Sequence, residues 1–270
     1  MIKTFKVLII SMMCVLLVLS MCACGNGSSQ TATEPVNSNA QSTTQATAPE
    51  AQPETSAGAA GEGEPVDPSY FDNAAFVGDS VSLKLSYYAA ATGALGNAQF
   101  FTAGSLGSAN ALWEVSDESV HPSYQGVKMT VEDCVANSGA EVVYIMLGMN
   151  DIGLYGIEDS VKNYKTLAEK ILEKSPAVKI VVQSMTPMTD TSEILGESLN
   201  NENIKVYNEK LRELCTQQGW AFVDVASVMY DAEGKNLNRD FCSDPDGLGV
   251  HFTEAGCEKW VEYLSTHVPA

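Results

Sequence analysis

Apolar runs bounded by turn residues recur along the second part of the chain. They lie at residues 74–77, 98–102, 142–147, 178–183 and 220–225, and each has the length of a strand. The runs Val142 to Leu147 and Val178 to Val182 are apolar without alternation, which is typical of strands buried on both faces of a parallel sheet. The pattern predicts a sheet of parallel strands.

Between these runs, apolar positions recur every three or four residues, as on one face of a helix. One such segment ends near Ser175-Pro176 and a second near Gly219. Their apolar positions are Val161, Tyr164, Leu167, Ala168, Ile171 and Leu172 in the first, and Ile204, Tyr207, Leu211, Leu214 and Cys215 in the second. Alternating strands and helices predict an α/β layered fold, whose ligands bind at the carboxyl ends of the strands.

The first 23 residues read as a bacterial lipoprotein signal. Lys3 and Lys6 precede an apolar run from Val7 to about Met21, and Ala23 supplies a small residue directly before Cys24. We therefore expect cleavage and lipidation at Cys24. The alternative is an uncleaved transmembrane anchor, because the apolar stretch is just long enough to span a bilayer. Both readings predict a membrane-held protein on the extracytoplasmic face.

Residues 24–66 predict a disordered tether, and residues 67–270 a single folded domain. The tether is rich in Ser, Thr, Ala, Pro and Glu, and residues 25–66 contain no Lys or Arg, so this segment buries too little apolar surface to fold. A flexible chain of this length has a root-mean-square reach of about 35 Å. That reach suits a domain working within a cell wall.

The net charge of the chain limits the classes of binding partner that can be expected. With 15 basic and 34 acidic residues the formal charge is −19, which argues against nucleic acid and against anionic lipid as binding partners.

The four cysteines of the domain, Cys134, Cys215, Cys242 and Cys257, lack the spacing of a metal or redox site. Cys242 and Cys257 lie near enough in sequence to be bridged, but buried free thiols are the preferred interpretation.

The candidate nucleophile is Ser80, which follows the apolar run 74–77 on a Gly78-Asp79 turn. A serine hydroxyl needs a general base within hydrogen-bond reach, usually histidine. His251 precedes a helix start at Thr253 and is the best candidate. His121 and His267, the other two histidines, have no supporting pattern.

Acyl transfer also needs hydrogen-bond donors for the oxyanion of the tetrahedral intermediate. The candidates are the N–H of Ser80, the N–H of Gly104 and the side-chain amide of Asn150, which follows the apolar run 142–147. Gly107 competes with Gly104 for the second place. A turn-capping role for Asn150 after a strand is the alternative.

At this point the sequence resembles the SGNH (GDSL-type) hydrolase family. Gly78-Asp79-Ser80 matches its first block, Gly104 its second, Gly148-Met149-Asn150-Asp151 its Gly-x-Asn-Asp block and His251 to Gly256 the end of its last block. The resemblance spans roughly residues 72–268. It implies a flavodoxin-like three-layer α/β/α fold, no cofactor or metal, and hydrolysis or transfer of acyl groups. By this resemblance Ser80 is the nucleophile, His251 the base, and Ser80, Gly104 and Asn150 form the oxyanion hole.

One position departs from the family pattern. The family has an aspartate three residues before the histidine, where this chain has Leu248; Asp246 stands five and Asp244 seven residues before His251. We expect Asp246 to orient the imidazole, because Asp246-Gly247 resembles the family's Asp-Gly turn. Asp244, a backbone carbonyl and a merely solvated turn are the alternatives.

The sequence therefore predicts a lipid-anchored serine esterase that hydrolyses O-acyl esters, acetyl esters among them, on a cell-wall or other polysaccharide. A small ester is the other expected substrate. An O-acyltransferase with the same residues is the nearest alternative. A non-catalytic glycan-binding lipoprotein is a second, because of the missing aspartate.

Overall fold

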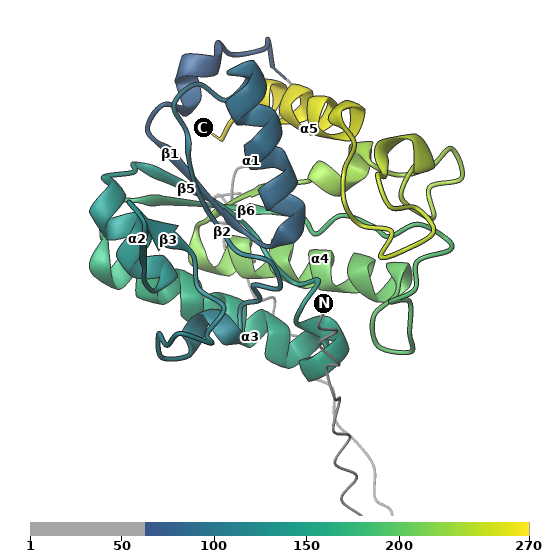
Figure 1. The fold of residues 1–270 in the computed structure, drawn as a ribbon, viewed down its shortest axis with the longest axis horizontal. Coiled ribbons are helices and arrows are strands. Elements are labelled where there is room, and N and C mark those ends of the chain that lie inside the picture. Colours follow the sequence, from purple (N-terminus) through teal and green to yellow (C-terminus); the bar gives the residue numbers. More distant parts are fainter. Residues whose placement is uncertain (1–62, 270) are drawn as a thin grey trace, which may run out of the picture. The chain divides into compact units, whose positions relative to one another are not determined.

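The computed structural model describes residues 63–269 (Figure 1). The expected signal segment, Cys24 and nearly all of the expected tether lie outside these residues. The strands are β1 (Ala74–Gly78), β2 (Gln99–Thr102), β5 (Val142–Met146), β6 (Lys179–Gln183) and β7 (Ala221–Val223), with a small hairpin of β3 (Ser123–Tyr124) and β4 (Val127–Lys128). Each of the five predicted apolar runs supplies one strand of the main sheet.

The main sheet has the order β2-β1-β5-β6-β7, and all its strand pairs are parallel. This is the flavodoxin-like order, in which the chain leaves β1 to one side and later returns to its other side. The reversal occurs between β1 and β5, where Gly78 pairs with Met146. The residues after these two strands therefore meet at the same edge of the sheet.

Five α-helices cover the sheet: α1 (Ser80–Thr92), α2 (Val131–Ser138), α3 (Ile152–Lys174), α4 (Asn201–Gln218) and α5 (Glu254–Thr266). Helices α1 and α5 contact each other on one face, while α2, α3 and α4 pack in a row on the other (Figure 1). The predicted three-layer α/β/α fold is confirmed. Short 3₁₀ turns span Pro68–Phe71, Asn110–Leu112, Val225–Val228 and Arg239–Phe241.

The two predicted helical segments form parts of α3 and α4. Helix α3 is interrupted at Gly156, whose φ of 73° and ψ of 173° are not helical, so the segment predicted from Val161 onward is its regular part. Helix α4 ends at Gly219, which has a φ of 70° and closes the helix in the left-handed conformation. Among the described helices, none is long and apolar enough to cross a membrane.

The core lies against both faces of the central strands. Phe76 of β1 stacks on Tyr144 of β5 with ring centroids 4.8 Å apart, and on Phe100 of β2 at 5.0 Å. On the face covered by α5, the Trp260 indole N–H donates to Gln183 Oε1 of β6 at 2.9 Å. Because this bond and the burial of Trp260 fix α5 on the sheet, they also fix the segment that leads into α5.

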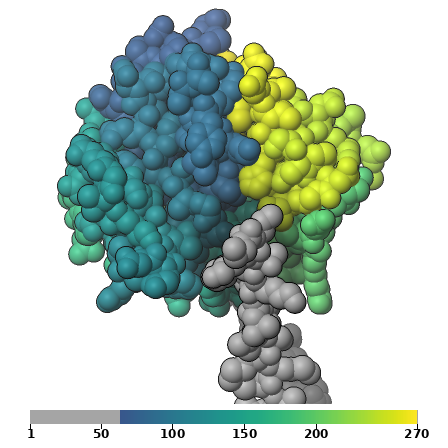
Figure 2. All heavy atoms as spheres, viewed as in Figure 1, coloured from purple at the N-terminus to yellow at the C-terminus, as the bar shows by residue number. Residues whose placement is uncertain are grey.

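The four cysteines of the domain are all buried and free, as the preferred interpretation predicted. On the face shown in Figure 2, the surfaces of α1 and of the C-terminal residues adjoin along a continuous seam.

Candidate active site

Ser80 is the first residue of α1, and two features of the preceding turn place it there. Asp79 caps the helix through its carboxylate, which accepts from Val81 N at 2.9 Å. A Cβ at Gly78 would stand 2.0 Å from Ser82 Oγ and 3.0 Å from Met146 O, so only glycine allows the chain to turn this close to β5. The tight turn leaves the Ser80 side chain partly exposed at the sheet edge.

His251 lies beside Ser80, as predicted. Its Nε2 is 2.9 Å from Ser80 Oγ, within reach for proton transfer. The residue stands three positions before the first residue of α5, and Thr253 caps the helix by accepting from Gly256 N. The other two histidines lie elsewhere: His121 Nδ1 contacts Ser119 Oγ, and His267 stacks on Tyr263.

The second ring nitrogen of His251 contacts Asp244. The distance from His251 Nδ1 to Asp244 Oδ2 is 2.7 Å, and Asp244 Oδ1 accepts from His251 N at 3.1 Å and Val250 N at 3.2 Å. Burial raises the pKa of the Asp244 carboxyl, but the hydrogen bonds from the His251 ring and backbone outweigh it and hold that pKa below its usual value. An ionised carboxylate here fixes the tautomer that leaves Nε2 free to accept the serine proton.

The expectation that Asp246 orients His251 is wrong. The Asp246 side chain is 75% exposed and pairs with Arg239 Nη2 at 2.7 Å, and its Oδ1 also accepts from Thr191 Oγ1 at 3.0 Å. Its carboxylate therefore serves a surface ion pair. Asp244, seven residues before His251, takes the role of the aspartate that the family has three residues before the histidine. The reason for expecting a non-catalytic protein is thereby removed.

The bulge of the chain between Asp244 and His251 explains this difference. The N–H groups of Gly247 and Gly249 both donate to Asp244 O, at 2.9 and 3.0 Å, so the intervening residues loop outward. Gly249 has a φ of 67°, and a Cβ there would stand 2.2 Å from Thr189 Oγ1. Leu248, at the family's aspartate position, is 43% exposed on this loop.

Asn150 lies at the same edge of the sheet, after β5. Its Nδ2 donates to Asp79 Oδ2 at 3.2 Å and to Leu106 O at 3.1 Å. Asp79 thus holds both the start of α1 and the amide of Asn150. Its carboxyl is buried, and desolvation raises its pKa to about 6 against the opposing hydrogen bond from Val81 N.

Asp151, quoted above only as part of a motif, anchors the loop that follows β2. Its carboxylate accepts from Ser108 N at 2.9 Å, Ala109 N at 2.9 Å and Ser108 Oγ at 3.0 Å. Burial raises the pKa of this carboxyl. Only the position of Asp151 in the Gly-x-Asn-Asp block hinted at a role, because the sequence does not show which loop it meets.

Gly104 and Gly107 differ in whether their N–H groups are engaged. The Gly107 N–H donates to Asn110 Oδ1 at 2.8 Å, so it is already committed. Within the described residues no hydrogen bond uses the N–H of Gly104, which lies in an exposed part of the loop after β2 with open space where a Cβ would stand. Of the two glycines, Gly104 is the one whose N–H is free to act as a donor.

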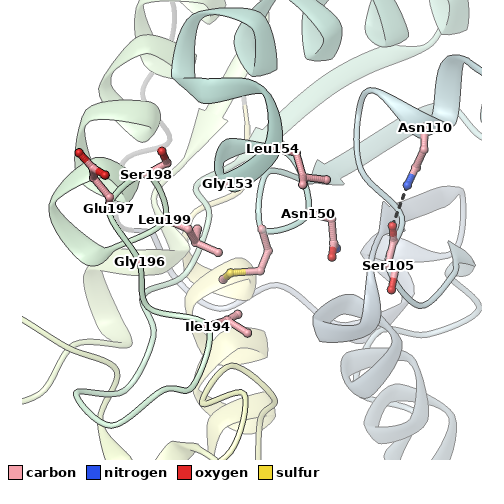
Figure 3. Close-up of a pocket in the computed structure, with 11 residues that line it drawn as sticks. Ser105, Asn110, Asn150, Gly153, Leu154, Ile194, Gly196, Glu197, Ser198 and Leu199 are labelled. Carbon is pink, nitrogen blue, oxygen red and sulfur yellow. Dashed lines mark hydrogen bonds between the residues drawn. The ribbon is translucent and has the colours of Figure 1, made fainter. Parts of the chain in front are cut away.

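A cavity of about 590 Å³ opens beside Asn150 (Figure 3). Its walls come from the loops after β2, β5 and β6, and apolar side chains form much of the lining. Met149, Leu154, Ile194 and Leu199 supply this apolar surface, and Ser105 and Asn110 supply polar groups at one side. In Figure 3 the side chain of Asn150 lies between Leu154 and the pair Ser105 and Asn110, which are joined by a hydrogen bond. The cavity can take an organic group attached to a carbonyl held at Asn150.

The arrangement has the parts needed for acyl transfer. A base stands 2.9 Å from a serine hydroxyl and is itself held by a carboxylate at 2.7 Å, and an amide lies at the edge of the adjoining cavity. In residues 63–269 no group of three or more His, Cys, Asp or Glu side chains is placed to hold a metal ion.

Comparison with known proteins agrees with this chemistry. Residues 131–259 match the model of the GDSL-like Lipase/Acylhydrolase family. A search among curated protein sequences finds no match to the chain.

Solved structures of similar fold include an acylhydrolase from Bacteroides fragilis, with a TM-score of 0.54 and 18% identity over 71% of this chain and 83% of that one. A structure named as a platelet activating factor from Streptococcus pneumonia has a TM-score of 0.52 and 16% identity, covering 73% and 87%. An acetyl xylan esterase has a TM-score of 0.52 and 14% identity, covering 72% and 98%. At these identities the likeness concerns the fold.

Proposed function

We propose that Ser80, His251 and Asp244 act as the catalytic triad of an ester-hydrolysing enzyme. The match of residues 131–259 to the GDSL-like Lipase/Acylhydrolase family supports this class of reaction. The observation that carries the proposal is the continuous chain of contacts from Ser80 Oγ through the imidazole to Asp244 Oδ2, at 2.9 and 2.7 Å. In the first step His251 Nε2 takes the proton of Ser80 as Oγ attacks the ester carbonyl.

The negative charge that develops on the carbonyl oxygen is met by the N–H groups of Ser80 and Gly104 and by the amide of Asn150. The Asn150 amide must exchange one of its bonds to Asp79 Oδ2 and Leu106 O for a bond to the oxyanion. Each such donor is worth roughly 3 kcal/mol in the transition state. Protonated His251 then gives its proton to the oxygen of the leaving alcohol. The alcohol departs, and the acyl group remains attached to Ser80 Oγ as the acyl-enzyme. Water, deprotonated by the same imidazole, releases the acid and restores Ser80.

The proposed substrate is an O-acyl ester, acetyl among the acyl groups, of a cell-wall or other polysaccharide. The protein is held at the extracytoplasmic face of the membrane by a lipid on Cys24. Support comes from the signal-like first 23 residues and the Ser/Thr/Pro-rich segment that follows, and from a fold shared with an acetyl xylan esterase. A domain on such a tether can reach a polymer that does not diffuse to it.

The central test is Ser80→Ala, with hydrolysis of p-nitrophenyl acetate and of acetylated glycans as readouts. The variant removes the nucleophile and is expected to abolish hydrolysis of both substrates. Ser86→Ala is the matched control, since Ser86 lies on the same helix and its hydroxyl donates to Leu83 O. Equal activity of Ser80→Ala and Ser86→Ala would contradict the proposal. Acyl transfer to an added sugar in place of acid release would contradict its hydrolytic step.

A further inference from the structure

A surface groove of about 290 Å³ runs between α1 and the chain that leads into α5. Lys84, Tyr87 and Thr92 of α1 form one wall, and Thr253 and Glu254 contribute to the other. The groove follows the seam on the face seen in Figure 2, where the surface of α1 meets that of the C-terminal residues. Its volume is near the lower end of the range for small-ligand sites, roughly 300 Å³.

Both walls of the groove begin within four residues of a proposed catalytic residue. Ser80, Lys84 and Tyr87 are spaced by four and three residues on α1, so they share one face of the helix. With a rise of 1.5 Å per residue, Tyr87 lies roughly 10 Å along the helix from Ser80. On the other wall, Phe252 and Thr253 directly follow His251. The lining residues nearest in sequence to the catalytic pair are thus Lys84, about one helical turn from Ser80, and Phe252, which directly follows His251.

The position of His251 assigns the groove to the alcohol part of the ester. The leaving oxygen must lie within reach of His251 Nε2, which gives it a proton. The groove contains the residues after His251, whereas the cavity at Asn150 is lined from the loops after β2, β5 and β6. The group beyond the ester oxygen therefore extends into the groove, and the acyl group extends into the cavity.

The lining has the chemistry of a site for a neutral sugar. Tyr87 exposes 62% of its surface and offers an aromatic ring on which the C–H face of a sugar can pack. Lys84 and Glu254, which form no salt bridge within residues 63–269, offer charged donors and acceptors for hydroxyl groups. Glu254, the first residue of α5, and Glu258, four residues further along the helix, add negative charge that disfavours an anionic ligand.

We infer that this groove binds the neutral glycan that carries the ester, with Tyr87 as the stacking platform for the sugar next to the catalytic centre. The inference rests on the proposed serine-esterase function and adds to it a specificity-determining residue. It predicts that the glycan contributes to binding through a surface that a small phenyl ester does not use.

The test compares the full chain in detergent with its Tyr87→Ala variant. The substrates are O-acetylated xylotetraose, O-acetylated chitotetraose and p-nitrophenyl acetate. For at least one glycan ester, Tyr87→Ala is expected to lower kcat/KM by about tenfold or more, mainly through KM, because the lost contact binds ground state and transition state alike. Hydrolysis of p-nitrophenyl acetate is expected to change by less than about twofold.

Two further variants serve as controls. Tyr87→Phe keeps the ring and is expected to retain the wild-type KM for the glycan. Tyr70→Ala removes another exposed tyrosine, 45% exposed and located before β1, at the opposite end of the strand from Ser80, and is expected to have no effect. Wild-type kinetics of Tyr87→Ala on both glycan esters would overturn the inference, as would an equal loss on p-nitrophenyl acetate.

Failure of the proposed function has a different signature. Wild-type protein would then leave p-nitrophenyl acetate as intact as Ser80→Ala does. In that case, calorimetric titration of the wild-type chain with unacetylated xylotetraose and chitotetraose measures whether the groove binds glycan. Binding that is weakened by Tyr87→Ala would support the groove, and absence of binding for both tetraoses would overturn it.

Discussion

Among single residues, Asp244 has the contact that decides the orientation of His251. Replacing Asp244 by Asn keeps the shape but offers an amide to Nδ1, which stabilises the wrong tautomer and does not stabilise the imidazolium. We expect kcat for p-nitrophenyl acetate to fall by at least about 10², towards the roughly 10⁴ known for the same change in a serine protease. Steady-state kinetics measures this.

Asp246→Asn is the matched comparison, because it alters a carboxylate two residues away that pairs with Arg239 on the surface. Exposed ion pairs contribute little to stability, about 0–1 kcal/mol, so this variant is expected to keep the wild-type kcat. A large loss in Asp246→Asn together with a normal rate in Asp244→Asn would refute the assignment of Asp244.

Asp79 gives a prediction about pH. Desolvation raises the pKa of this buried carboxyl to about 6, above its ordinary value of 3.8, so between these values the folded state binds more protons than the unfolded state. The free energy of unfolding therefore decreases as pH rises through this window. Relative to Asp79→Asn, which has no such titration, the wild type is expected to lose about 2–3 kcal/mol between pH 4 and pH 7.

Denaturant unfolding of both proteins at the two pH values measures this difference. Asn is a good N-cap residue, so the start of α1 is retained in the variant and the comparison isolates the charge. A pH dependence that is the same in both proteins would show that Asp79 does not titrate in this window.

The sequence identifies some members of the site and not others for a physical reason. Ser80 and Asn150 follow apolar runs, and the topology of a parallel sheet brings such positions together. The role of Asp244 depends on a bulge closed by hydrogen bonds from Gly247 and Gly249, and that of Asp151 on a contact with Ser108, 43 residues away. Neither follows from a local pattern.

At the scale of elements, the loop after β2 packs closely against the start of α3, where Gly107 contacts the Asp151 carboxylate. A Cβ at Gly107 would stand 2.8 Å from Asp151 Oδ1, and this carboxylate is held by three hydrogen bonds. Gly107→Ala is therefore expected to lower the free energy of unfolding by about 1–3 kcal/mol, as overpacking does. In an Asp151→Ala background, where the carboxylate is absent, the same substitution is expected to cost clearly less.

A double-mutant cycle by denaturant unfolding measures this coupling. Gly104→Ala is the control, since a Cβ at Gly104 meets nothing within 4 Å. Additive effects of Gly107→Ala and Asp151→Ala would contradict the contact.

The loops around Asn150 form a cavity of about 590 Å³, which is more space than an acetyl group fills. We expect p-nitrophenyl butyrate to be hydrolysed with a kcat/KM at least equal to that of the acetate. Ile194→Trp, which adds volume to the lining, is expected to lower the rate on butyrate more than on acetate. Parallel losses on both esters would mean that the acyl chain does not enter this cavity.

The elements that the sequence predicts are those with a continuous apolar run or a long periodic pattern. The five strands and the regular parts of α3 and α4 follow from continuous apolar runs and from spacings of three and four. The hairpin of β3 and β4 has two residues in each strand, and α2 has eight residues. Such short elements carry too few apolar positions for a period to emerge, and contacts with the rest of the domain determine them.

For the whole molecule, the proposed membrane attachment depends on one residue outside the described part of the chain. Cys24→Ser removes the thiol that would receive lipid. We expect the variant to move from the membrane fraction to the soluble fraction while keeping its activity on p-nitrophenyl acetate, because the lipid, and not a spanning helix, is the proposed anchor. Fractionation and immunoblotting measure this, and full membrane retention of Cys24→Ser would indicate an uncleaved helix instead.

The four free thiols of the domain bear on how the protein matures. Burial raises the pKa of Cys134, Cys215 and Cys257 to about 12 and that of Cys242 to about 11, so at neutral pH almost no thiolate exists to attack a disulfide or an alkylating reagent. Because the fold of residues 63–269 contains no disulfide, its formation does not depend on an oxidase. The same polypeptide is expected to reach the same fold in a reducing compartment and in an oxidising one, so that the redox state of its surroundings does not limit where it can be made.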